Sequence, residues 1–115
     1  MSPRPAVALF CGSREWTDRE RIRRDLESLP EASVVIEGGA RGADRIAREE
    51  ARALGLHVAT VAALWDHYGR AAGYRRNEAM ARLCPDFVYA YPLGGPGTAQ
   101  MIRLAEDECI PVREP

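Results

Sequence analysis

The sequence predicts an α/β fold in which a doubly wound, five-stranded parallel sheet carries helices on both faces. Three observations lead to this prediction. Short apolar runs alternate with helical patterns, the runs are nearly continuous in apolar residues, and the length of 115 residues suits a single domain, residues 1–115. Right-handed crossovers then give the strand order 3-2-1-4-5. In such a sheet ligands bind where the order reverses, between strands one and four.

Five short apolar runs are the predicted strands. They span residues 7–10 with the strand ending at Gly12, 33–37, 57–61, 86–91 and 110–112. Apolar runs of this length, bounded by turn residues, favour buried strands. The last run, Ile110-Pro111-Val112, is expected to close the sheet as a short edge strand.

Helical patterns fill the intervals between the strands. The first helix is expected to begin at the N-cap Thr17, with Glu20 at the capping-box spacing, and to stop before Pro30. The remaining helices are expected over residues 43–54, about 76–83, and from about Gly97 onward. The inward stripe of the last helix is expected to contain Thr98, Met101, Ile102 and Ala105.

Two glycine-rich turns each follow an apolar run and open a helical pattern. They are Gly38-Gly39-Ala40-Arg41-Gly42-Ala43-Asp44 and Gly94-Gly95-Pro96-Gly97-Thr98. Glycine lets backbone N–H groups approach an anion closely, and the positive end of the following helix adds to the attraction. Short turns also use glycine merely to reverse the chain, and neither turn has the spacing of a P-loop or of G-x-G-x-x-G. The pairing of the two turns predicts a nucleotide-like ligand.

Composition narrows the function classes. The 16 basic and 17 acidic side chains nearly balance, which does not favour a polyanion partner such as DNA or RNA. Cys11, Cys84 and Cys109 are expected as reduced, buried thiols, although the position of Cys11 at the end of the first strand also suits a catalytic cysteine. Only His57 and His67 offer nitrogen ligands, and we expect neither a metal site nor a cofactor. Without a recognisable secretory or membrane-spanning run, the protein is expected to be cytoplasmic and not membrane-bound.

Four motifs, in order along almost the whole chain, resemble the SLOG superfamily and in particular its small YspA-like (YpsA-related) branch. They are Gly12-Ser13-Arg14, the turn 38–44, Ala72-Gly73 with Arg76-Asn77 and Met80, and the turn 94–98. The resemblance implies a Rossmann-like fold. It also implies kinship with the Lonely Guy phosphoribohydrolases, the DprA/Smf DNA-processing proteins and SLOG sensor domains that bind nucleotide-derived signals. A homodimer is a further expectation that comes from these relatives.

One departure from the family bears on activity. The Lonely Guy motif P-G-G-x-G-T-x-x-E ends in an acid associated with cleavage of the N-glycosidic bond, and the matching residue here is Met101. Met101 lies on the predicted inward stripe, which favours a role in the core. We therefore expect no catalytic residue at this position, while phosphate binding through backbone N–H groups is retained.

The expected ligand-binding set combines the motif residues with a few charged side chains. It comprises Gly12, Ser13, Arg14, Glu37, Gly38, Gly39, Gly42, Asp44, Arg76, Asn77, Gly94, Gly95, Gly97 and Thr98. Arg14 and Arg76 are the expected phosphate ligands, because a guanidinium can make two parallel hydrogen bonds to one phosphate. Arg41 and Arg75 are expected in solvent.

For several residues the sequence allows two roles. Glu37 is either a solvated strand end or a carboxylate facing a ribose, and Asp44 is expected mainly as an acid in the first turn of its helix. Asn77 either contacts the ligand or caps the third helix. In the long connection after the third strand, which is the expected functional loop, Trp65 and Tyr68 either stack on a base or cover the sheet edge.

The leading functional expectation is a binding module for a nucleotide or a nucleotide-derived molecule of the ADP-ribose kind. The first alternative is a phosphoribohydrolase acting on a nucleoside monophosphate, with Glu37 or Asp44 in place of the missing acid. The second is a DprA-like partner in DNA processing, which the neutral charge balance and the lack of an aromatic-rich basic groove disfavour.

Overall fold

The computed structural model describes residues 4–115 and contains a sheet of five strands. The strands are β1 (Val7–Gly12), β2 (Val34–Glu37), β3 (His57–Thr60), β4 (Phe87–Tyr91) and β5 (Val112–Arg113). Their order β3-β2-β1-β4-β5, with every pairing parallel, confirms the predicted Rossmann-like topology. β1 and β4 are in register up to Gly12 opposite Tyr91, so the loops that follow these two strands start side by side.

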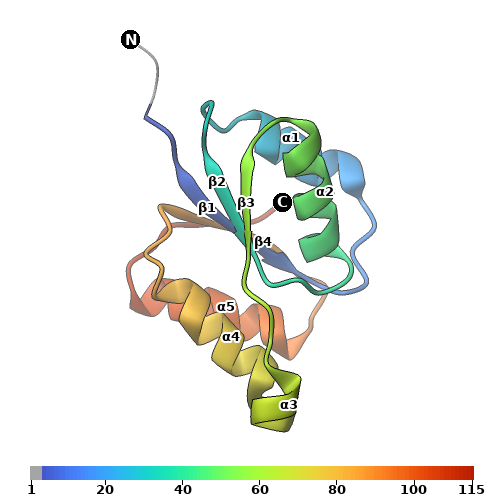
Figure 1. Ribbon diagram of the computed structural model, residues 1–115, viewed down its shortest axis with the longest axis vertical. Coiled ribbons are helices and arrows are strands. Elements are labelled where there is room, and N and C mark those ends of the chain that lie inside the picture. Colours follow the sequence, from blue (N-terminus) through green and yellow to red (C-terminus); the bar gives the residue numbers. More distant parts are fainter. Residues whose placement is uncertain (1–3) are drawn as a thin grey trace.

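The helices cover both faces of the sheet. They are α1 (Arg19–Glu27), α2 (Ala43–Ala53), α3 (Trp65–Tyr68), α4 (Ala72–Ala81) and α5 (Pro96–Asp107), with a 3₁₀ turn over Gly69–Ala71. α1 and α2 lie on one side of the sheet, α4 and α5 on the other, and α3 projects beyond it (Figure 1). In residues 4–115 no helix is both long and apolar enough to cross a membrane.

The start of α1 differs from the prediction. Asp18, and not Thr17, is the N-cap, and its carboxylate accepts the Arg21 N–H at 3.1 Å. This places Glu20 at the second helical position, where it does not complete a capping box. Two adjacent residues could each cap this helix, and the sequence alone does not choose between them.

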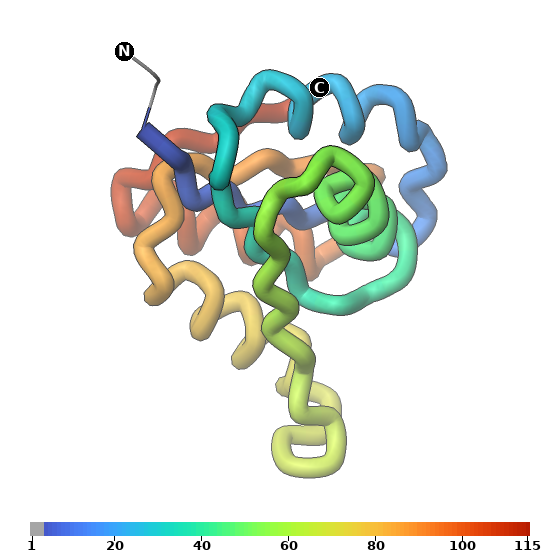
Figure 2. Tube along the Cα trace, turned by 45° about the horizontal axis from the view of Figure 1, so that its top comes forward, coloured from blue at the N-terminus to red at the C-terminus, as the bar shows by residue number. Residues whose placement is uncertain are grey.

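Helix α4 begins earlier than predicted, at Ala72 rather than near Arg76. Gly73 disfavours helix in a sequence pattern, yet it lies in the first turn of α4, where an added Cβ would be 3.7 Å from the ring of Trp65. α3 and the 3₁₀ turn lead directly into this helix, so the predicted functional loop is largely helical. The segment projects from the body of the molecule as a narrow hairpin (Figure 2).

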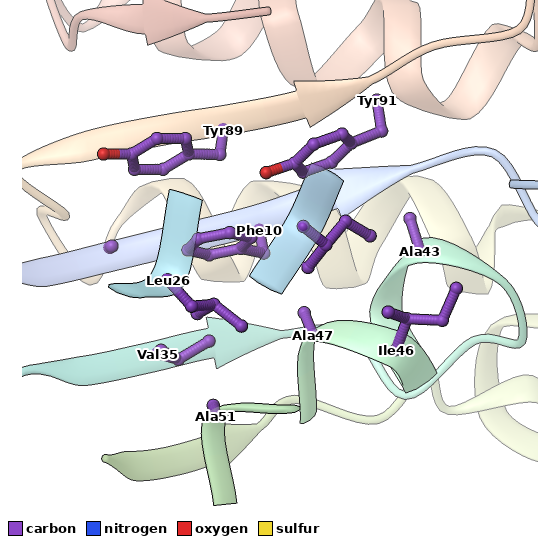
Figure 3. Close-up of a cluster of buried hydrophobic side chains, with 11 residues drawn as sticks. Phe10, Leu26, Val35, Ala43, Ile46, Ala47, Ala51, Tyr89 and Tyr91 are labelled. Carbon is purple, nitrogen blue, oxygen red and sulfur yellow. The ribbon is translucent and has the colours of Figure 1, made fainter. Parts of the chain in front are cut away.

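Two apolar clusters, one on each side of the sheet, fix the strands that carry the site. On one side Phe10 of β1 stacks on Tyr89 of β4 with ring centroids 4.7 Å apart, beside Leu26 of α1 (Figure 3). On the other side Met80 of α4 and Met101 of α5 pack in the second cluster. Met101 is fully buried, as the inward stripe predicts.

The prediction of buried cysteines holds for one of the three. Cys11 is buried, whereas Cys84 and Cys109 are exposed. These two residues follow α4 and α5 with φ angles of 55° and 57°, in the left-handed region that often ends a helix. Such positions lie at the surface, and apolar neighbours in the sequence do not bury them.

Candidate functional site

A pocket of about 410 Å³ lies at the carboxyl ends of β1 and β4, at the predicted switch point of the sheet. We call it the inner pocket. The residues of the expected set that line it are Gly12, Ser13, Arg14, Asp44, Arg76, Asn77, Gly95, Gly97 and Thr98. The loop after β1, the start of α2, helix α4 and the start of α5 thus meet around one space.

A second pocket of about 580 Å³, the outer pocket, adjoins the first. The residues common to both pockets are Arg14, Ala40, Trp65 and Arg76. Gly38 and Gly39 of the expected set line the outer pocket. Glu37, Gly42 and Gly94 line neither.

The N-terminus of α5 opens into the inner pocket. Its N-cap is Gly95, which has no side chain that could cap the helix, and Pro96 begins the helix. A Cβ added at Gly95 or Gly97 would meet no atom within 4 Å. Since the N–H groups of a first helical turn lack partners within the helix, this end combines backbone donors, a positive dipole end and free space. An anion is the ligand that such an arrangement favours.

Arg76 and Asn77 connect the two glycine-rich turns. Nη1 of Arg76 donates to the carbonyl oxygen of Gly38, and its Nε donates to Oδ1 of Asn77 at 2.9 Å. Nδ2 of Asn77 donates in turn to the carbonyl oxygen of Gly97 at 3.2 Å and to Oε1 of Gln100 at 2.8 Å. Asn77 is therefore part of the network around the pocket and is not a helix cap. The network holds a positive charge between the two turns.

Glu37 shapes the first glycine-rich turn from inside the protein. The residue is fully buried at the end of β2. Its Oε1 accepts the Gly39 N–H at 2.7 Å, and its Oε2 accepts the hydroxyl of Thr60 on β3. The interpretation of Glu37 as a solvated strand end is therefore wrong, because β3 covers this end of β2.

Asp44, in the first turn of α2, closes the same turn from the other side. Its Oδ2 accepts the N–H groups of Gly38 and Ala40, each at 3.2 Å. Its Oδ1 has no hydrogen-bond partner within residues 4–115, and the residue lines the inner pocket although it is only 5% exposed. Burial raises the pKa of Asp44 to about 6, helped by the charge of Glu37 and opposed by the two N–H groups and by Arg76. This carboxyl can thus accept or donate a proton near neutral pH.

The two carboxylates limit what the first turn can offer a ligand. The N–H groups of Gly38, Gly39 and Ala40 all have partners inside the protein. Gly42, with φ of 77°, has a structural reason of its own, because a Cβ there would lie 2.4 Å from the carbonyl oxygen of Ser13. Open backbone donors toward the inner pocket therefore come from α5 rather than from this turn.

The thiol of Cys11 is not suited to nucleophilic chemistry. Cys11 lines the inner pocket, but burial raises the pKa of its thiol, and the charge of Asp44 raises it further. A thiol of this kind stays protonated and is a poor nucleophile. Among the residues that the structure describes, no group of three or more His, Cys, Asp or Glu side chains is arranged to hold a metal ion.

Aromatic side chains border the pockets on the side of α3 and α4. Trp65 is half exposed and lines both pockets, with Cζ of Arg14 5.9 Å from its ring centroid. Tyr74 lines the inner pocket, whereas Tyr68 lines neither. Tyr74 is absent from the predicted site because the pattern predicts the start of this helix only near Arg76. With the helix extended to Ala72, the spacing of three residues places Tyr74 on the same helical face as Asn77.

Comparisons with known proteins show the family to which the chain belongs. The family model described as YspA, cpYpsA-related SLOG family matches residues 6–68. The chain is 40% identical over 114 aligned residues to the Gene 61 protein of Mycobacterium phage D29, an alignment that covers 90% of this chain and 91% of that protein. No solved structure matches the chain significantly.

Proposed function

This chain belongs to the YspA, cpYpsA-related SLOG family, and on that premise we propose that its inner pocket binds a nucleotide or a nucleotide-derived molecule of the ADP-ribose kind. Family membership supports a nucleotide-related binding module. The choice of pocket, the placement of the ligand and the roles of single residues are our proposal.

The observation that carries the proposal is the open N-terminus of α5 in a pocket lined by arginines. Gly95 and Gly97 leave the first turn without side-chain obstruction, and Arg14, Arg70 and Arg76 line the same pocket. A phosphate at this place accepts hydrogen bonds from backbone N–H groups, and guanidinium groups neutralise its charge. This is the usual chemistry of nucleotide phosphate sites.

The groups around the proposed phosphate position suit the sugar and the base of a nucleotide. Asp44 is the single carboxylate that lines the inner pocket among the described residues, and its free Oδ1 suits a ribose hydroxyl as the donor. Trp65 and Tyr74 offer aromatic surface for a base. The 410 Å³ of the inner pocket is within the size range of sites for small organic ligands.

One observation favours a hydrolase as the second candidate. Asp44 has a pKa of about 6 and lines the pocket, which are properties of a general acid or base. Met101, at the position of the Lonely Guy acid, is buried in the core, and both oxygens of Glu37 already have partners. Cleavage of an N-glycosidic bond would therefore depend on Asp44.

The experiment that tests the binding function is a thermal-shift and calorimetric screen with AMP, GMP, CMP, UMP, ADP-ribose and the four matching nucleosides. A ligand that binds only the native state raises the melting temperature, by an amount that grows with the logarithm of the ligand concentration relative to the dissociation constant. We expect at least one phosphorylated compound to bind and the corresponding nucleoside to bind more weakly. Absence of binding by every phosphorylated compound would refute the proposal.

A further inference from the structure

The outer pocket is unusual in the sign of the charges around it. Four arginines line it, namely Arg14, Arg41, Arg45 and Arg76, and no aspartate or glutamate does. The protein as a whole carries a formal charge of −1. The excess of positive charge at this pocket is therefore local and is not a general property of the protein.

The ion pairs of the protein do not account for these arginines. Glu15 pairs with Arg41 at 2.8 Å, and both side chains are largely exposed. Within residues 4–115, Arg14, Arg45 and Arg76 make no ion pair. The four guanidinium groups thus outnumber the two carboxylates whose charge acts on them, Glu15 on Arg41 and Asp44 on Arg76, and the pocket keeps a net positive charge.

The position of Arg45 does not serve the stability of its helix. It lies in the first turn of α2, where the helix dipole disfavours a cation. The side chain is exposed and gains no burial that would offset this cost. An anionic partner in the outer pocket would give this arginine a favourable role.

The outer pocket adjoins the inner one and has room for a ligand group. Arg14, Trp65 and Arg76 border both pockets, and the outer pocket is otherwise lined mainly by small residues, with Gly39, Ala62 and Ala63 among them. The connection from β3 to α3, which carries the two alanines, runs past the carboxyl end of the sheet beside this region (Figure 1). A molecule bound in the inner pocket can therefore extend past Trp65 into the outer one.

We propose that the outer pocket holds a second anionic group of the same ligand. The ligand class is then a nucleotide whose two anionic groups are separated by the sugar, such as a nucleoside 3′,5′-bisphosphate or a dinucleotide. One phosphate lies at the N-terminus of α5, and the second is bound by Arg45 and Arg41. This inference rests on the proposed function, since it takes the inner pocket as the site of the first phosphate.

The test compares the four ribonucleoside 5′-monophosphates with their 3′,5′-bisphosphates by calorimetry at constant ionic strength. For at least one base we expect the bisphosphate to bind about tenfold more tightly, the gain of one charge-assisted contact in a partly screened site. The Arg41→Ala/Arg45→Ala protein should lose this ratio. Arg52→Ala, which removes a cation from the last turn of the same helix away from both pockets, should retain it.

The outcomes separate this inference from the proposed function. If monophosphates bind and bisphosphates bind no more tightly, the second subsite is refuted and the first phosphate site stands. If the ratio is present but survives in the double arginine variant, the assignment of the second anion to the outer pocket is refuted. If neither class of compound binds, this inference fails, and the proposed function fails with it when ADP-ribose does not bind either.

Discussion

The guanidinium of Arg76 lies directly against the backbone of Gly38. Its Nη1 donates to the carbonyl oxygen of Gly38, and a Cβ added at that residue would lie 2.5 Å from the same nitrogen. Arg76 can therefore occupy its place between the two pockets only while position 38 carries no side chain. This contact spans 38 residues of sequence and joins the loop after β2 to helix α4.

The substitution Gly38→Ala tests this contact. The added methyl should displace Arg76 and weaken nucleotide binding about tenfold, the value of one hydrogen bond to a charged group. In an Arg76→Ala background the same substitution should cost little, because the colliding atoms are gone. Calorimetry on the four proteins of this double-mutant cycle measures the coupling. Equal losses in both backgrounds would show that the two residues act independently.

Replacement of Arg76 should weaken the binding of a nucleotide but not that of the matching nucleoside. We expect Arg76→Ala to weaken binding of a nucleoside monophosphate by about 1.5–3 kcal/mol while barely changing the affinity of the nucleoside. Arg75→Ala is the matched control, since Arg75 is more than half exposed and pairs with Glu78 at 3.8 Å. Isothermal titration of both ligands with both variants is the measurement. Equal losses for nucleotide and nucleoside would remove Arg76 from the phosphate site.

The pH dependence of stability should report the burial of Asp44. Its pKa rises from 3.8 to about 6 in the folded protein, so between these values the folded state binds more protons than the unfolded state. The contribution of Asp44 to the free energy of unfolding should therefore fall as the pH rises from about 4 to about 6, by at most about 3 kcal/mol. Urea titrations across this range should show that the unmodified protein loses stability relative to Asp44→Asn as the pH rises. Identical pH profiles for the two proteins would contradict the raised pKa.

The buried position of Met101 bears on the hydrolase alternative. Because no acid occupies this position, we expect purified protein incubated with nucleoside monophosphates to release little or no free base. Chromatography of the reaction mixture detects the base directly. Sustained release that disappears in Asp44→Asn would overturn the binding-only function and assign the acid to Asp44. Met101→Glu should destabilise the protein, since it places a carboxylate in the apolar cluster beside α5.

The strand order was predictable because each strand is a local apolar run and the handedness of crossovers is nearly fixed. The ends of helices were less so. Thr17 and Asp18 can both cap α1. Gly73 disfavours a helix, so the local pattern does not predict the first turn of α4. In each case the first residue of the helix depends on tertiary packing, which the local sequence does not reveal.

The site was predictable as a set of motifs but not as a network. The turns at 38–44 and 94–98 are visible in the sequence, whereas the pairing of Glu37 with Thr60 depends on the neighbour of β2 in the sheet. Asp44 is a second example for a different reason, because its side chain accepts hydrogen bonds from N–H groups of Gly38 and Ala40 that the glycine pattern suggests are free. The sequence therefore predicted most of the residues that surround the inner pocket better than the backbone donors that remain open to it.

The proposed phosphate site at the N-terminus of α5 is tested most directly by isothermal titration of Gly97→Val with the nucleotide that the screen identifies. No atom lies within 4 Å of a Cβ at this position, so the variant should fold and melt like the unmodified protein, while its side chain fills the approach to the helix end. Ala99→Val, an exposed position on the same helix that lines neither pocket, serves as the control and should bind normally. We predict no detectable binding by folded Gly97→Val, and an unchanged dissociation constant in that protein would contradict the site.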